Sequence, residues 1–555
     1  MSERERMKII LLFVVLCQVL NVLGERTRPN IVLILNDDQD MQLGGLKPLR
    51  NTKRLLLKNG SSASNWFIHT PVCCPSRGEI LTGRYFHNIR ASNYDAKHTC
   101  MHVNTSKVNP FSFGTYLGRL NYTLGYFGKH MNVAPHAPPP GWDCNTCHWF
   151  ANGGGSDVEP GGYLNATFSD FFGNSSSPVD EYHNNRSQYI ANTNGEFSGY
   201  TTSIIGNKSI AWLNRIADSE KPFMLTVAPK APHVPSTPAS WYKNEYNNMS
   251  APRDDEAYNA SKEALSNHHG LISSQSPITI EQGNEIDELF RNRWRTLLSV
   301  DDLVTELYET IRTMNLLNST YWIVTSDHGY NLGQHRLPSC KLNVYDHDTR
   351  IPLIISGPGI SMNTKFDLLG SNVDVAPTML SLAGASPDEI SQHFDGKSIL
   401  NVLDLDESVL LPWTRSSYVE HRENKTTWRD SHLIEYHSLG NVNRTGHLVD
   451  DNITNTYRAL RFDKTSRYGD FLYVWCSSVH RKKKITRKFE HRYSEFTEIS
   501  DWNFTNITFH EAFNMSDGTD MFQMRNVYKN LSTEVREAFA SLVSEKWKCI
   551  GDTCI

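Results

Sequence analysis

Carboxylates and a histidine stand directly after two apolar segments of the sequence, where they could hold a metal ion. Asp37 and Asp38 follow one segment, and Asp327 and His328 follow the other. A pair of adjacent aspartates can also serve as a helix cap or a turn, but three carboxylates at two segment ends are hard to explain in that way. Oxygen ligands suit a hard divalent cation. We therefore expect Asp37, Asp38 and Asp327 to hold such a cation.

The cysteines point to a second kind of chemistry, because an odd number of them remains once the expected signal peptide is removed. The sequence has 10 cysteines, and Cys17 lies in a segment that we expect to be removed as a signal peptide, which leaves nine. In an oxidising compartment cysteines are used in pairs. One thiol is therefore left over, and it is either accidental or committed to a reaction.

The segments that position these residues have the pattern of an α/β protein. Three apolar, partly β-branched runs, Ile31–Leu35, Phe223–Val227 and Tyr321–Thr325, are each followed by polar residues and predict buried strands. The stretch Trp294–Leu317 has apolar residues at close to helical spacing. Strands that alternate with helices favour a largely parallel sheet. Ligands of such sheets bind outside the carboxyl ends of the strands, which is where the carboxylates stand.

The segment Cys73–Arg84 identifies the leftover thiol. It fits the pattern C-x-P-S-R-x-x-x-L-T-G-R at all eight specified positions, with Cys74 at the first x. This is the signature of the sulfatase family, and the chain resembles that branch of the alkaline-phosphatase-like superfamily. The resemblance implies that the formylglycine-generating enzyme converts Cys73 to formylglycine, which leaves eight cysteines for disulfides. It also implies a large, mostly parallel sheet flanked by helices, with a smaller C-terminal α+β domain.

The chemical use of such an aldehyde can be stated from its reactivity. A hydrated aldehyde carries two hydroxyl groups on one carbon. One can attack the sulfur of a sulfate ester, and the other can then expel sulfate as the aldehyde re-forms. The nucleophile needs activation and charge neutralisation, which a cation held by oxygen ligands supplies.

The resemblance also implies a role for each residue of the site. It places one calcium ion on Asp37, Asp38, the modified Cys73, Asp327 and His328. His328 is the least expected of these ligands, because imidazole is softer than calcium normally selects. Arg77 and Lys129 then orient the diol and the sulfate. His233 and Lys341 contact the sulfate and its bridging oxygen, and one of these two protonates the leaving alkoxide.

Within the family, the chain most resembles the N-acetylglucosamine-6-sulfatases. The similar segments extend over nearly the whole chain and include Thr296–Val304, Gly357–Ile360, Asn455–Arg458 and the terminal cysteines Cys549 and Cys554. Asn132 also matches this branch, whereas many sulfatases have histidine at the position of Met131. The resemblance implies removal of 6-O-sulfate from N-acetylglucosamine in heparan sulfate or keratan sulfate. His328 replaces the asparagine of this branch, which leaves a broader arylsulfatase as an alternative.

Other functions are weighed against the same residues. A phosphate-transferring relative would use serine or threonine with two zinc ions, and Cys73 in a full modification motif argues against it. A catalytically silent, glycan-binding homologue is a further alternative, although every expected catalytic residue is present. The endosulfatases of heparan sulfate carry a long basic insertion that this chain lacks.

We expect His130, beside Lys129, to be a core or surface residue.

Composition excludes several classes of protein. The 555 residues are 39 % hydrophobic, 21 % charged and 11 % aromatic, which are values of a folded globular chain. The net charge of −5 supplies no general cationic field for nucleic acid. We therefore expect no nucleic-acid partner.

The ends of the chain predict its route through the cell and its domains. Residues 1–24 have the basic start, apolar run and small-residue cleavage point of a signal peptide. No later stretch is long and apolar enough for a membrane anchor, and seventeen glycosylation sequons support a secretory route. We expect a lysosomal glycoprotein, with secretion as the alternative.

We place the catalytic domain at 25–405 and the smaller domain at 406–555. The basic run at 481–488 is a solvated loop or a contact for an anionic polysaccharide.

Overall fold

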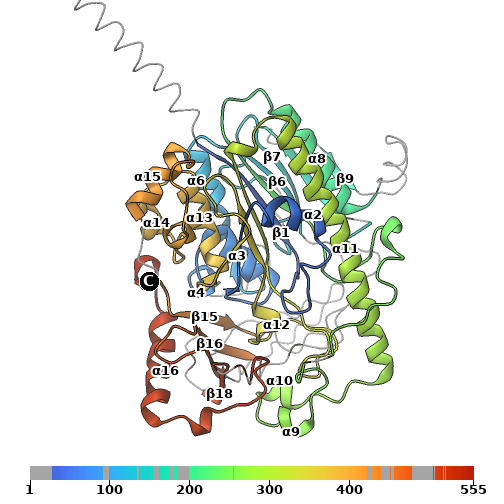
Figure 1. Ribbon diagram of the computed structural model, residues 1–555, viewed down its shortest axis with the longest axis vertical. Helices are drawn as coiled ribbons and strands as arrows, with labels where there is room; N and C mark the ends of the chain where they lie inside the picture. Colours follow the sequence, from blue (N-terminus) through green and yellow to red (C-terminus); the bar gives the residue numbers. More distant parts are fainter. Residues whose placement is uncertain are drawn as a thin grey trace, which may run out of the picture.

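Figure 1 shows the computed structural model. It describes residues 28–91, 99–133, 135, 137–153, 162–164, 166–173, 180–183, 199–253, 255–421, 428–438, 451, 455–477, 504, 507–516, 518 and 520–554. The expected signal peptide, the basic run at 481–488 and eight of the sequon asparagines lie outside these residues. Among the helices of the described residues, none combines the length and the apolar character that crossing a bilayer requires.

A ten-stranded sheet forms the centre of the part of the chain that the structure describes. Its order is β13-β2-β12-β11-β1-β10-β6-β7-β8-β9. The neighbours β11, β1, β10, β6 and β7 run parallel, and the sheet turns antiparallel at β12 and at β8. The strands are β1 (Asn30–Asn36), β2 (Gly60–Ala63), β6 (Thr123–Lys129), β7 (His148–Asn152), β8 (Thr167–Phe172), β9 (Asp180–His183), β10 (Phe223–Ala228), β11 (Thr320–Ser326), β12 (Leu353–Ser356) and β13 (Thr364–Phe366).

The three predicted strands are confirmed as β1, β10 and β11, which lie side by side. In β1 the side chains alternate between two hydrophobic clusters, with Ile31, Leu33 and Leu35 in one and Val32 and Ile34 in the other. Because both faces of the strand are covered, its sequence is apolar at every position rather than at every second one. This is why the continuous apolar run predicted a central strand.

Helices cover both faces of the sheet (Figure 1). One cluster packs on α8 (Thr201–Arg215) and α11 (Ile280–Thr313). The opposite cluster packs on α3 (Cys73–Thr82), α6 (Phe113–Arg119) and α13 (Val375–Leu382). The predicted helix Trp294–Leu317 corresponds to the second half of α11, which begins 14 residues earlier and ends at Thr313, four residues before the predicted end. It begins there because Thr279 and Gln282 form a capping box.

A separate four-stranded antiparallel sheet forms the C-terminal part. Its strands, in spatial order, are β15 (Ser431–Tyr436), β16 (Thr456–Phe462), β17 (Phe471–Ser477) and β18 (Ile507–Asn514). Helix α16 (Thr533–Lys546) covers one face, and the other face packs on residues 337–345 of the larger unit. Helix α15 (Pro412–His421) lies against α13. We therefore propose that the domain division, expected after residue 405, lies between α15 and β15.

The described residues form three disulfides, where the sequence left eight cysteines for pairing. They are Cys74–Cys100, Cys144–Cys147 and Cys549–Cys554. Cys340 and Cys476 lie outside them, so the expectation that all eight would pair is wrong. Both are buried within one hydrophobic cluster, where a thiol packs as a small apolar side chain. Burial raises the pKa of the Cys476 thiol well above its usual value.

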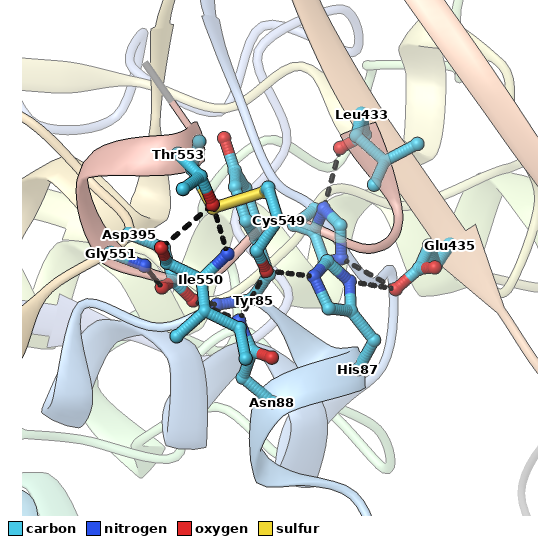
Figure 2. Close-up of a disulfide and its surroundings, with 12 residues drawn as sticks. Tyr85, His87, Asn88, Asp395, Leu433, Glu435, Cys549, Ile550, Gly551 and Thr553 are labelled. Carbon is cyan, nitrogen blue, oxygen red and sulfur yellow. Dashed lines mark hydrogen bonds and ion pairs between the residues drawn. A yellow bond between two sulfur atoms is a disulfide. The ribbon is translucent and has the colours of Figure 1, made fainter. Parts of the chain in front are cut away.

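The C-terminal disulfide loop returns to the larger unit (Figure 2). The backbone N–H of Gly551 donates to Asp395 at 2.7 Å. The carbonyl of Cys549 accepts from Asn88 at 3.0 Å and faces His87 at 3.1 Å. The last residues of the chain are therefore fastened to the region around α4 (Phe86–Ile89), only a few residues after the sulfatase-like motif.

Candidate active site

The ends of β1 and β11 place two pairs of predicted residues side by side. The last residues of the two strands, Asn36 and Ser326, are in register, so Asp37 and Asp38 lie next to Asp327 and His328. The Oδ1 atom of Asp327 accepts backbone N–H groups of Asp38 and His328, both at 2.9 Å. These bonds join the two strand ends into one rigid edge.

Cys73 enters this edge from the start of α3. Its Sγ atom lies 3.8 Å from Oδ1 of Asp37, 3.4 Å from Nε2 of His328 and 3.4 Å from Nζ of Lys341. All residues of α3 are buried, and the helix ends at Gly83, which has φ +60°. The motif thus forms a buried helix that aims its first side chain at the strand ends.

Four of the five predicted ligands converge on one point. The ligand atoms of Asp37, Asp38, Cys73 and His328 all lie within 4.8 Å of one another, and all four residues are buried. Asp327 is adjacent but is not part of this group. Its Oδ2 atom accepts from Nε of Arg77 at 2.8 Å, so this carboxylate is turned toward the guanidinium.

The predicted cations surround the same group. Lys129 Nζ lies 2.6 Å from Oδ2 of Asp37, and Lys341 Nζ lies 2.8 Å from Oδ1 of Asp38. Arg77 also donates to the carbonyl of Lys129 at 2.8 Å. The structure therefore brings these three cations to the carboxylates from α3, from the end of β6 and from the loop after β11.

His233, which follows β10, is the most distant member of the set. Its Nε2 atom lies 3.9 Å from Oδ2 of Asp38, and its Nδ1 atom lies 2.6 Å from the carbonyl of Val234. When Nδ1 donates to this carbonyl, Nε2 faces the site. Burial lowers the pKa of His233 well below its usual value, and the charge of Lys341 lowers it further.

The neighbouring charges shift the pKa values of Asp37, Cys73 and His328 toward their charged forms. Burial raises the pKa of Asp37, but Lys129 and the other cations outweigh this effect and hold it well below its usual range. Burial also raises the pKa of the Cys73 thiol, yet Lys129 and Lys341 bring it below its ordinary value. Burial lowers the pKa of His328, whereas the neighbouring aspartates raise it to about 9. A cation bound by His328 would displace that proton.

The two carboxylates of the group offer oxygen ligands for a hard cation. The Oδ2 atom of Asp38 is buried and has no hydrogen-bond donor among the described residues, although a buried carboxylate oxygen normally has one. Oxygen atoms of Asp37 and Asp38 face the same space as Cys73. Carboxylate oxygens suit a hard divalent cation, whereas the sulfur of Cys73 and the imidazole of His328 are softer donors in the same group.

Arg293 belongs to the site, although the motifs did not reveal it. Its Nη2 atom donates to the carbonyl of Asp38 at 2.7 Å and to Oδ1 of Asp40 at 2.8 Å. Asp38 has φ +67°, a conformation that needs support from its surroundings. A signal was available in the sequence, because Arg293 interrupts the apolar face of α11 between Phe290 and Leu297.

His130 lies outside the group. It is buried, and its ring contacts those of Tyr126 and Trp149 edge-on. Burial lowers the pKa of His130 to about 3, so the ring is neutral. This placement agrees with the expectation of a core residue.

Comparisons with known proteins agree on one family. A family model described as Sulfatase matches residues 29–385. An N-acetylglucosamine-6-sulfatase of Homo sapiens is 30 % identical, over 98 % of this chain and 89 % of its own. An extracellular sulfatase homologue of Drosophila melanogaster is 33 % identical, over 74 % of this chain and 33 % of its own. A solved structure, described as a complex with its substrate D-glucosamine-2-N,6-O-disulfate, shares the fold with TM-score 0.62 and 20 % identity, over 94 % of this chain and 98 % of that chain.

Proposed function

The chain belongs to the sulfatase family, as a sulfuric ester hydrolase, and we propose that it removes 6-O-sulfate from N-acetylglucosamine residues of heparan sulfate or keratan sulfate. The observation that carries the proposal is the 30 % identity to N-acetylglucosamine-6-sulfatase over 98 % of the chain, which includes the C-terminal sheet. The fold neighbour whose title names a 6-O-sulfated glucosamine as substrate adds support. We further propose that the protein works in the lysosome.

The nucleophile in this proposal is Cys73 after conversion to formylglycine. The Sγ atom then stands in for an oxygen of the hydrated aldehyde. That group supplies one hydroxyl for attack on sulfur and a second whose deprotonation expels sulfate and restores the aldehyde. The placement of Cys73 at the centre of the cluster, 3.4 Å from both His328 and Lys341, supports this role.

The surrounding side chains have separate tasks. Arg77 is held by Asp327 and Lys129 is held by Asp37, so both cations keep fixed positions when sulfate enters. They neutralise charge on the sulfate oxygens and orient the nucleophile. Lys341 and His233 both face the carboxylate of Asp38. This pair contacts the bridging oxygen, and one of its members donates the proton that the alkoxide needs to leave.

We propose calcium as the metal of the site. Asp37, Asp38 and His328, together with the modified Cys73, would hold it, and Asp327, whose Oδ1 atom lies 3.8 Å from Nε2 of His328, is proposed as the fifth ligand. The ion would supply positive charge to the nucleophile and to the sulfate oxygens. Arg293 keeps the Asp38 backbone in the conformation that presents its carboxylate.

The first test is a peptide mass analysis of the segment around Cys73, on protein from a eukaryotic secretory host. We expect loss of the thiol and gain of an aldehyde. The same protein is then assayed with N-acetylglucosamine-6-sulfate and with an aryl sulfate. Hydrolysis of both supports the proposal, whereas hydrolysis of the aryl ester alone points to the broader arylsulfatase. An unmodified Cys73, in a host that converts another sulfatase, would favour the silent glycan-binding homologue.

Removal of the metal gives a second prediction. Dialysis against a calcium chelator is expected to lower kcat by about 100-fold or more, because charge neutralisation by a metal is worth several kcal/mol in the transition state. Added Ca²⁺ should restore activity better than Mg²⁺, which requires a smaller, near-octahedral ligand set. Full activity in the metal-free protein would contradict the proposed site.

A further inference from the structure

Lys341 depends on a loop for its position. It belongs to no helix or strand and lies between β11 and α12 (Asp346–Thr349). Its side chain is buried, and Nζ reaches both Oδ1 of Asp38 at 2.8 Å and Sγ of Cys73 at 3.4 Å. A lysine side chain has several rotatable bonds, so the position of the ammonium group depends on how firmly the backbone of this loop is held.

The backbone next to Lys341 has an unusual conformation. Leu342 has φ +87°, a region that residues other than glycine rarely adopt and that persists only where the surroundings enforce it. The flanking residues are fixed locally. Cys340 exchanges two backbone hydrogen bonds with Asn331, at 2.8 and 3.3 Å, and Asn343 donates to Asp348 at 2.9 and 2.8 Å.

The C-terminal sheet holds Leu342 itself. Its carbonyl accepts two hydrogen bonds, from the hydroxyl of Tyr457 at 2.9 Å and from Nδ2 of Asn455 at 3.1 Å. Tyr457 lies in β16 and Asn455 directly precedes that strand. Both side chains are fully buried. A strand of the smaller unit therefore reaches the backbone beside a residue of the active site.

A second layer fixes the orientation of Asn455. Its Oδ1 atom lies 3.2 Å from Nε2 of His269. His269 is in turn held by Glu511 of β18, whose Oε1 atom accepts the backbone N–H of His269 at 2.6 Å and lies 3.0 Å from Nδ1. With His269 donating to Oδ1, the amide of Asn455 can only present its NH₂ group to Leu342.

We propose that Asn455 and Tyr457 are positioning residues of the reaction, which hold Lys341 at Asp38 and Cys73 through the carbonyl of Leu342. The inference rests on the proposed role of Lys341 and extends the catalytic apparatus to the C-terminal sheet. Without these donors the peptide after Leu342 is free to relax toward ordinary backbone angles. Nζ of Lys341 then loses its fixed place. Misplacement of a reacting group by about 1 Å costs about 100-fold in rate.

The test uses Tyr457→Phe in the full-length secreted protein, with 4-methylumbelliferyl sulfate as substrate. The change removes only the hydroxyl. We expect kcat to fall about tenfold, with KM changed by less than about threefold, because positioning is lost rather than binding. Asn455→Asp, which keeps the acceptor for His269 but removes the donor to Leu342, should act in the same direction.

Tyr436→Phe is the matched control. Tyr436 lies opposite Tyr457 in the register of β15 and β16, is equally buried, and donates its hydroxyl to Asp451 at 2.9 Å. It therefore reports the cost of losing a buried tyrosine hydroxyl in the same sheet. We expect this variant to keep its kcat.

A double-mutant cycle with Lys341→Met decides the question, because coupled residues give non-additive effects. If Tyr457 acts through Lys341, Tyr457→Phe has no further effect on kcat in the Lys341→Met background. A full tenfold loss in that background, or an equal loss in Tyr436→Phe, would overturn the inference. So would full kcat in Lys341→Met alone. Because the substrate is an aryl sulfate, wild-type protein that cleaves it but not N-acetylglucosamine-6-sulfate would overturn only the proposed sugar.

Discussion

Replacement of Cys73 by serine is expected to abolish sulfate-ester turnover while the protein stays folded. A serine hydroxyl has nearly the shape of the thiol, so the buried start of α3 is preserved. It cannot become an aldehyde, and after one attack on sulfur it has no second hydroxyl to expel the sulfate. We expect kcat to fall on the order of 10⁴-fold or more, as in other enzymes that lose their nucleophile.

The measurement combines steady-state kinetics with intact mass. After incubation with an aryl sulfate, the Cys73→Ser protein should carry one sulfate on the introduced serine. Thr82→Ser is the control, because it is an equally conservative change at a buried position of the same helix α3; it should keep most of the activity. If the Cys73→Ser protein hydrolysed the substrate at the wild-type rate, the nucleophile would have been assigned to the wrong residue.

The centre of the fold could be predicted because its signals are local. The runs at 31–35, 223–227 and 321–325 are apolar at every position, and the structure shows why, since helices cover both faces of β1. Polar residues directly after such runs meet at one edge of a parallel sheet. The convergence of Asp37, Asp38 and His328 then follows once β1 and β11 are neighbours in the sheet.

The supports of the site could not be predicted, because they come from distant parts of the chain. Leu342 looks like an ordinary apolar residue, and only the folded chain shows that its carbonyl is held by Tyr457, which is 115 positions away. Cys340 and Cys476 lie outside the disulfides, and the number of cysteines in the sequence could not show this, because it depends on where the folded chain buries them. Arg293 could be predicted in part. A charged residue within the apolar face of a helix indicates a buried partner, but the sequence does not show that this partner is Asp38 or Asp40.

The second large effect concerns stability and arises from a buried cluster at the C-terminal loop (Figure 2). One oxygen of Glu435 in β15 lies 3.1 Å from Nε2 of His69 and 3.0 Å from Nδ1 of His87. The remaining ring nitrogens face the carbonyls of Leu433, at 2.6 Å, and of Cys549, at 3.1 Å. A neutral imidazole donates from one nitrogen only. All four contacts are therefore hydrogen bonds only when both rings are protonated.

Charged groups from several elements face this cluster. Arg458 of β16 lies 3.1 Å from the other oxygen of Glu435. Glu79 of α3 faces His69, and burial raises the pKa of that carboxyl. His432 of β15 also lies close, and burial together with the charge of His69 keeps its pKa well below the usual value. Glu435 is thus the anion shared by the rings of His69 and His87 and by the guanidinium of Arg458.

The pKa shifts set the pH range in which the cluster stabilises the fold. Burial lowers the pKa of His69, but Glu79 and Glu435 outweigh it and raise the pKa above 6.5. This contribution is complete below pH 6.5 and is lost as pH rises through the raised value. Burial raises the pKa of Glu435, but the neighbouring cations hold it well below 4.5, so its contribution is present above pH 4.5. Both are therefore complete between about pH 4.5 and 6.5, a range that suits the proposed lysosomal site.

Glu435→Gln should consequently destabilise the protein most in mild acid. Removal of one partner from a buried ion pair costs about 3–5 kcal/mol, and we expect Tm to fall by about 5 °C or more at pH 5.5. At pH 8.5 the loss should be smaller, because the contribution of His69 in the wild type is lost as pH rises through its raised pKa, although Arg458 keeps its charge. Glu309→Gln, which removes a half-exposed partner of Arg312, is the control and should change stability by about 1 kcal/mol or less. Equal losses of Tm at the two pH values would mean that the proton of His69 does not contribute to stability. A chelator-sensitive Tm restored by zinc would mean that a metal ion joins His69, His87 and Glu435.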